Sequence, residues 1–210
     1  MEQHYNRVRL CGQIVTAPEL SHVNHDRQFD RCLLSVPRLS GQTDEIWLLL
    51  PHDLPGAAEV SAGDTVSVSG QLRSYNNRSG VGSRLVLSVF VRSLTREATE
   101  PVNRIRLSGV ICKPPHLRRT PLGREICDVI LAVNRRCGRA DYLPCIAWGA
   151  VAQAVGESEV GEVLTAEGRI QSRRYTKLAD GQPQQRTAYE VSIMRPATPE
   201  EFWEEDVRNG

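Results

Sequence analysis

Apolar residues alternate with polar ones in many short segments of the chain, with a period of two residues. Val8 and Leu10 are separated by an arginine, and so are Ile105 and Leu107. This period is typical of a β-strand with one buried face. The same pattern predicts strands at 33–36, 46–50, 65–72, 84–91, 129–133, 142–147, 162–170 and 187–193. A short helix is predicted after the third strand of each half, at 54–59 and 150–156.

The predicted strands fall into two sets because the sequence repeats itself after about 97 residues. NRVRLCG at 6–12 matches NRIRLSG at 103–109, and VSGQLRS at 68–74 matches AEGRIQS at 166–172. Ordered matches at a nearly constant offset indicate the duplication of a whole domain. We therefore expect an all-β chain of two tandem oligonucleotide-binding (OB-fold) barrels, each with five strands and a short helix after strand three. The expected boundaries are 1–95 and 103–196 for the barrels, 96–102 for a linker and 197–210 for an acidic aromatic tail.

The charge is unevenly distributed along the 210 residues, although the formal net charge is only +1. Residues 1–98 are balanced, residues 99–196 carry a net charge of +5, and residues 197–210 carry −4. The basic second half favours a polyanionic partner. Nearly all of the cations are arginines, which stack on bases as well as pairing with phosphates.

Catalysis, metal binding and membrane insertion have no support in the sequence. The six cysteines are widely spaced, the five histidines are scattered, and no Gly-rich phosphate loop or nucleophile motif occurs. We expect the cysteines to be buried thiols, and we expect no cofactor, no metal and no enzymatic activity. Apolar runs are too short for a membrane span and the first residues lack a signal-peptide core, so a cytoplasmic, nucleoid-associated protein is expected.

The strands of the second repeat place aromatic and cationic side chains on one face. Tyr142 and Trp148 have the same parity on the third strand, and the residues of like parity on the fourth are Arg169, Gln171, Arg173 and Tyr175. Single-strand binders combine such aromatic platforms with a cationic groove. Arg119, Arg135 and Arg136, on nearby loops, are further candidates for phosphate contacts. The alternative for Tyr142 and Trp148 is packing at the barrel mouth.

The second repeat resembles the bacterial single-stranded DNA-binding protein family along 103–194. The stretches that carry the resemblance are NRIRLSGVICKPPHLRRTPLG, VILAVNRR, DYLPCIAWG and AEGRIQSRRYTKLADGQ. The resemblance implies that Tyr142, Trp148 and Tyr175 occupy base-stacking positions, whereas Cys137 stands near a fourth position where the family has an aromatic residue. It also implies binding of single-stranded DNA in replication, recombination or repair, and a homodimer that presents four barrels.

The first repeat carries a weaker form of the same pattern, because IWLLLPHDL replaces the family's aromatic-Gly pair before the helix. Its candidate binding residues are Trp47, Arg73 and Tyr75, with core or interface packing as the alternative for Trp47. We expect this barrel to serve mainly in assembly. The tail, with Phe202 and Trp203, is either a peptide that binds replication or repair proteins or a helical turn that caps the barrel.

Two other functions compete with sequence-tolerant binding of single-stranded DNA. One is an OB-fold assembly or adaptor protein of a primosome-like complex, whose contact with nucleic acid is secondary. The other is binding of RNA, because stacking does not distinguish the two sugars.

Overall fold

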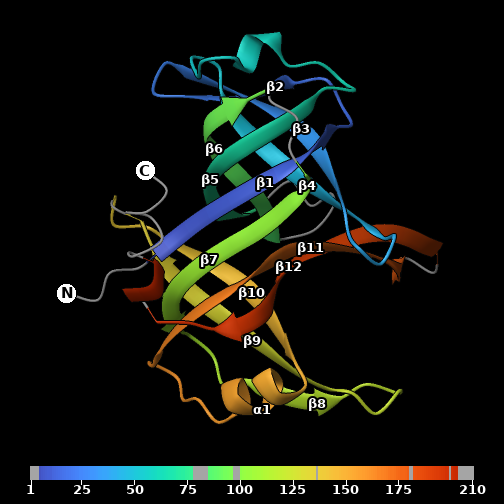
Figure 1. The fold of residues 1–210 in the computed structure, drawn as a ribbon, viewed down its shortest axis with the longest axis vertical. Helices are drawn as coiled ribbons and strands as arrows, with labels where there is room; N and C mark the ends of the chain where they lie inside the picture. The colour runs from blue at the N-terminus through green and yellow to red at the C-terminus, as the bar shows by residue number, and fades with distance from the viewer. Residues whose placement is uncertain are drawn as a thin grey trace. The chain divides into compact units, whose positions relative to one another are not determined.

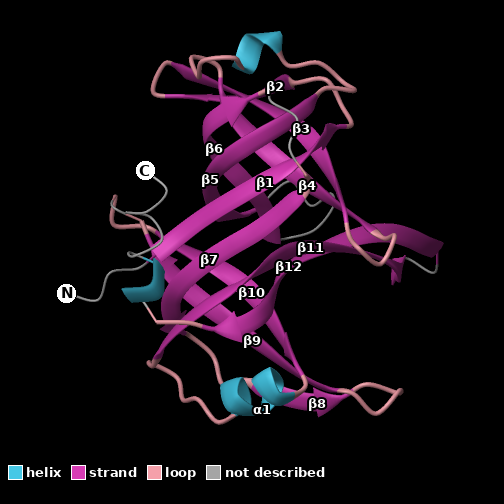
Figure 2. Ribbon diagram, in the orientation of Figure 1, coloured by secondary structure: helices cyan, strands magenta, loops and turns pink. Residues whose placement is uncertain are grey.

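Strands make up most of the computed structural model, which describes residues 5–77, 85–96, 100–135, 137–179, 182–198 and 200–202 (Figure 2). The first repeat contains β1 (Tyr5–Ile14), β2 (Glu19–Asn24), β3 (Arg27–Pro37), β4 (Thr43–Pro51), the 3-10 turn η1 (Ala57–Glu59), β5 (Thr65–Asn76) and β6 (Leu85–Thr95). The second contains β7 (Val102–Ile111), β8 (His116–Arg119), β9 (Glu125–Asn134), β10 (Ala140–Trp148), α1 (Ala150–Gly156), β11 (Val163–Ala179) and β12 (Gln182–Pro196).

Each repeat forms a barrel with the same strand order (Figure 1). The first runs β2-β3-β4-β6-β5-β1 and closes by pairing β1 with β3, and the second runs β8-β9-β10-β12-β11-β7 and closes by pairing β7 with β9. The closing registers are related by the 97-residue offset: Gln13 pairs with Ser35, and Val110 pairs with Ala132. The tandem barrel architecture predicted from the repeat is therefore confirmed, with β2 and β8 as additional short edge strands.

The alternation of apolar residues produces one buried face on most strands, whereas the edge strands β2 and β8 are exposed along their whole length. Leu34, Ile46 and Leu48 are at most 1% exposed in the first barrel, and Leu107 and Leu131 are equally buried in the second. The inward faces of these strands together form the apolar core of each barrel, and the outward faces carry most of the polar residues.

Glycine is required where two strands approach most closely. A Cβ added at Gly70 would lie 2.2 Å from the carbonyl oxygen of Phe90, and one added at Gly168 would lie 2.2 Å from that of Ser192. Because backbone oxygens cannot move aside cheaply, both repeats retain glycine at this point of the fourth strand.

The helix predicted at 54–59 is shorter than expected. Only the 3-10 turn Ala57–Glu59 forms, because Pro55 has no amide hydrogen to donate and Gly56 takes the left-handed φ of 81°. The helix of the second repeat covers the predicted residues, Ala150–Gly156. It follows Gly149, whose φ of 58° and ψ of −130° suit glycine alone.

The chain packs as two compact units whose boundaries do not coincide with the repeats. The first unit comprises Val8–Asn103 together with Ile170–Tyr189, and the second comprises Met1–Arg7, Arg104–Arg169 and Glu190–Gly210. The outer halves of β11 and β12 therefore pack with the first repeat, although they belong to the second in sequence. We call this segment, Ile170–Tyr189, the exchanged hairpin.

A buried carboxylate holds the exchanged hairpin in the first unit. Asp44 is fully buried and receives two hydrogen bonds from the Arg38 guanidinium, one of them 2.7 Å from Nε. The backbone N–H of Ser172 donates to the same carboxylate over 2.9 Å, and the side-chain amide of Asn103 donates to it over 3.4 Å. Asp44 thus joins the β3–β4 loop of the first repeat to the fourth strand of the second.

Replacing Asp44 with Asn should destabilise the protein by roughly 3 kcal/mol, because the Arg38 charge would lose its partner in a nearly buried site. The matched control is Asp53→Asn, which breaks the Arg27–Asp53 pair, whose side chains are 51% and 64% exposed. That change should cost less than about 1 kcal/mol. Urea denaturation of both variants measures the difference, and equal losses would contradict the role assigned to Asp44.

Candidate nucleic-acid interface

The outward face of β10 exposes the two aromatic residues expected there. Tyr142 is 53% exposed and Trp148 is 40% exposed, while Leu143, Cys145 and Ala147 between them point into the core. A separation of six residues along a strand corresponds to about 20 Å. Tyr142 and Trp148 are therefore two separate platforms on one face rather than a single pocket.

Arg135 is committed to a structural ion pair, so the prediction that it contacts phosphate is not supported by its placement. Its guanidinium forms two hydrogen bonds to Asp141, which is 1% exposed, and the one from Nε measures 2.8 Å. The same arrangement occurs in the first repeat, where Arg38 binds Asp44. The pair fixes the β3–β4 loop in the first repeat and the β9–β10 loop in the second. Arg136 lies outside the described residues.

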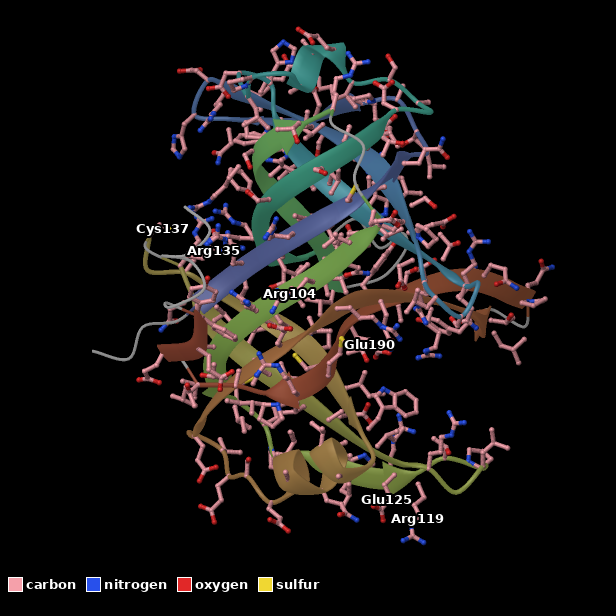
Figure 3. The ribbon with its side chains drawn as sticks, viewed as in Figure 1. Arg104, Arg119, Glu125, Arg135, Cys137 and Glu190 are labelled. Atoms are coloured by element: carbon pink, nitrogen blue, oxygen red, sulfur yellow. The ribbon has the colours of Figure 1, made fainter. Side chains whose placement is uncertain are left out.

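The loop after Arg135 brings a cysteine to the surface (Figure 3). Gly138 has a φ of 76°, and its N–H donates to the Arg135 carbonyl over 3.1 Å. Cys137 is exposed there, so the expectation of a buried thiol is wrong for it. It holds for Cys11, Cys32, Cys127 and Cys145, and burial raises the pKa of Cys32 to about 12.

Arg119 lies on the edge strand β8, where it is paired with a carboxylate of β9. Its terminal nitrogen is 2.9 Å from Glu125, and the two side chains lie together beside α1 (Figure 3). Hydrogen bonds, first from Arg119 and then from Gln153, lower the pKa of Glu125. Arg118 pairs with Asp128 in the same way, at 2.6 Å. The basic residues of this strand thus have carboxylate partners, although the Arg119 side chain is 74% exposed.

The fourth-strand residues differ in what they can offer to a ligand. Arg173 is exposed, and its guanidinium carbon lies 5.5 Å from the centroid of the half-buried Tyr175 ring. Gln171 is only 8% exposed and Arg169 is half-buried. Within the exchanged hairpin, the structure therefore brings Arg173 and Tyr175 together, and it gives Gln171 little contact surface. Arg169 belongs to the second unit.

The first repeat holds an aromatic residue that the sequence reasoning missed. The guanidinium of Arg73 stacks 3.9 Å from the centroid of Phe90, and the side-chain oxygen of Gln71 accepts hydrogen bonds from Arg73 and Arg92. Tyr75 is 55% exposed on the same strand as Arg73. Phe90 stands between Val89 and Val91 on one strand, so its ring points to the face opposite the two buried valines. This alternation is visible in the sequence and was the available signal.

Trp47 is half-buried and contacts two neighbouring side chains. The guanidinium of Arg31 lies 5.3 Å from its ring centroid, and its indole forms a hydrogen bond with Tyr189 of the exchanged hairpin. Burial raises the pKa of Tyr189, and the nearby Glu45 carboxylate raises it further. This placement agrees with the interface alternative for Trp47.

Phe202 is fully buried, which agrees with the capping alternative for the tail. Its ring centroid lies 5.1 Å from that of Tyr5, and the guanidinium of Arg106 lies 5.1 Å from the Phe202 ring. Arg195 pairs with Glu201 beside it, at 2.6 Å. Trp203 lies outside the described residues.

Two kinds of feature were looked for in the part of the chain that the structure describes. Its residues contain no group of three or more His, Cys, Asp or Glu side chains placed to hold a metal ion. None of its helices is long and apolar enough to cross a membrane.

Comparisons with known proteins agree with this architecture. Residues 102–196 match the model of the single-strand binding protein family. The chain is 36% identical over 81 residues to single-stranded DNA-binding protein 2 of Listeria innocua, covering 35% of this chain and 51% of that protein. It is 35% identical over 80 residues to single-stranded DNA-binding protein B of Bacillus subtilis, covering 35% of this chain and 71% of that protein.

A solved structure covers both repeats. The wild-type single-stranded DNA binding protein from Thermus aquaticus superposes with a TM-score of 0.75 at 20% identity, covering 94% of each chain. This likeness confirms the fold of two OB barrels. The chain spans about half the length of the first curated relatives that it matches.

Replacing Phe202 with Ala should destabilise the second unit by about 3 kcal/mol, because the ring is removed from a fully enclosed site. Met194→Ala is the control, because Met194 is 65% exposed in the same unit and its loss should cost under about 0.5 kcal/mol. Thermal unfolding of the two variants provides the comparison. If Phe202→Ala unfolds like the wild type, the aromatic ring does not cap the barrel.

Proposed function

Because this chain belongs to the single-strand binding protein family, we propose that it binds single-stranded DNA without strong sequence preference. The observation that carries the proposal is the exposure of Tyr142 and Trp148 on the outward face of β10. Exposing a large aromatic ring to water is unfavourable in free energy. A base stacked on each of these two rings would contribute about 1–3 kcal/mol to the free energy of binding. Their separation of about 20 Å suits a single strand of DNA that runs along the barrel, rather than a single nucleotide.

Arginine supplies the phosphate contacts in this proposal. Arg173 is exposed and lies against Tyr175, so one side chain can pair with a phosphate while the other stacks a base. Arg119 can contribute through its exposed guanidinium, in exchange for Glu125. Arg135 and Gln171 have structural contacts or little exposure, and we assign them no direct contact with the strand.

We assign the first repeat mainly to assembly. Trp47 already forms a hydrogen bond with Tyr189 and a cation–π contact with Arg31. Arg73, Phe90 and Tyr75 remain as a secondary site for single-stranded DNA. The homodimer, the partners in replication or repair, and the role in recombination remain proposals that follow from the family. Sedimentation of the purified chain tests the dimer.

An adaptor protein of a replication complex is the second candidate function. It is favoured by the contact of Trp47 with Tyr189 and by the balanced charge of residues 1–98. In that case contact with nucleic acid would be weak and would not discriminate between single and double strands.

Titration of tryptophan fluorescence with oligo-dT, oligo-rU and a DNA duplex separates these functions. We expect quenching by oligo-dT, weaker quenching by the duplex, and an affinity that falls with salt as phosphate contacts release counterions. Equal response to all three, or none, would favour the adaptor. Stronger binding of oligo-rU would indicate RNA.

Replacing Trp148 with Ala should weaken binding of labelled oligo-dT about tenfold, because one stacking platform is lost. Trp148→Phe should keep most of the affinity, since a flat ring remains. Leu122→Ala is the control, because Leu122 is 86% exposed in the same unit but offers no ring. Fluorescence anisotropy measures all three variants, and an unchanged affinity of Trp148→Ala would refute the stacking role.

A further inference from the structure

The register of three neighbouring strands places Arg118 on the same face of the sheet as Trp148. Arg118 of β8 pairs with Ile126 of β9, and Ile126 pairs with Trp148 of β10. Residues that are directly paired across antiparallel strands point to the same side of the sheet. Arg118 and Trp148 therefore share the outward face, and two strand spacings separate them by about 10 Å.

A carboxylate lies beside this row of residues on the same face. Asp128 pairs with His116 of β8 and with Ile146 of β10. Ile146 has the parity of Tyr142 and Trp148 and lies between them on β10, so Asp128 also belongs to the outward face. Single-stranded DNA that stacks on both aromatic rings would run past this carboxylate.

Asp128 holds the guanidinium of Arg118. The Nε atom of Arg118 donates to Oδ2 of Asp128 over 2.6 Å, and Nη2 donates to Oδ1 over 3.3 Å. Nδ1 of His116 lies 3.9 Å from the same carboxylate. The hydrogen bond with Asp128 raises the pKa of Arg118, and the negative charge of Glu190 raises it further. Carboxylates thus surround this arginine on the face that is proposed to meet DNA.

The Arg118 side chain is nevertheless accessible to a second anion. It is 45% exposed, and that of Asp128 is 41% exposed. A phosphate next to a base on Trp148 would approach the guanidinium from solvent. Carboxylate and phosphate oxygens accept the same guanidinium hydrogen bonds, so Asp128 and the phosphate would compete for one donor.

The exchange of one anion for the other is inexpensive. An ion pair this exposed contributes little net stability, because solvent screens it and ordering two side chains costs entropy. The backbone pairing of β8 with β9, from His116–Asp128 to Arg119–Glu125, would keep Arg118 in place after its side chain leaves Asp128.

We propose that Asp128 is a competitor within the binding face, which occupies Arg118 until a phosphate of the bound DNA displaces it. Arg118 is then the phosphate contact that accompanies the Trp148 platform, and Asp128 weakens binding at that end of β10. This inference rests on the proposed binding of single-stranded DNA by the β10 face.

The test compares Asp128→Asn, Arg118→Ala and the double variant with the wild type, using labelled oligo-dT at about 50 and 200 mM salt. Asp128→Asn should bind about three- to tenfold more tightly at the lower salt, and its salt slope should steepen by up to about 1, because Arg118 reaches phosphate without giving up a carboxylate. Arg118→Ala should bind more weakly than the wild type. Adding Asp128→Asn to Arg118→Ala should change the affinity less than about twofold, because no guanidinium is left to release.

Glu201→Gln is the matched control, because Glu201 pairs with Arg195 at 2.6 Å in the same unit and both side chains are 44% exposed. Its affinity should stay within about twofold of the wild type. Equal tightening by Glu201→Gln would indicate a general charge effect and would overturn the proposal. Tightening by Asp128→Asn that persists in full without Arg118 would indicate repulsion alone, and an unchanged Asp128→Asn would indicate no competition; either result would also overturn it. Failure of the wild type to bind oligo-dT would instead refute the proposed function.

Discussion

The buried carboxylate of Asp44 is the constraint on which the first unit depends. A carboxylate with no exposed surface is tolerated only if hydrogen bonds replace its water, and here they come from Arg38, Ser172 and Asn103. Arg38 lies in the β3–β4 loop, close to Asp44 in sequence, but Asn103 and Ser172 come from the second repeat. Satisfying this one group therefore requires the second repeat to supply part of the first unit. Arg135 and Asp141 repeat the local pair at an offset of 97.

The burial of the carboxylate partner distinguishes arginines with a structural role from arginines that are accessible to a ligand. Arg38 and Arg135 have nearly buried carboxylate partners and stabilise loops. Arg173 and Arg174 are exposed on the exchanged hairpin, and the Glu45 partner of Arg174 lies at the surface rather than in the core. A count of basic residues per repeat cannot make this distinction, because it depends on which carboxylate each guanidinium reaches. The surplus charge of the second repeat is thus only partly a binding surface.

The strands, the barrel order and the helix at 150–156 could be predicted because they depend on local alternation and on a repeat visible in the sequence. Parity also predicted correctly that Tyr142 and Trp148 share an exposed face. The partner of Arg135 and the contacts of Trp47 could not be found in this way, because parity gives the face of a side chain but not its neighbours. Tyr189 reaches Trp47 only because the hairpin packs with the other repeat. One signal was available and unused: Arg38 and Asp44 recur as Arg135 and Asp141 at the repeat offset.

The central claim is that single-stranded DNA lies on the β10 face of the second repeat, while the first repeat anchors the exchanged hairpin. Photochemical crosslinking of an oligo-dT that carries 5-iodouracil, with the adducts mapped by mass spectrometry, tests it most directly. The account predicts adducts mainly at Tyr142 and Trp148, because iodouracil reacts with the rings on which it stacks. Adducts confined to Tyr75 and Phe90, with none on β10, would contradict it.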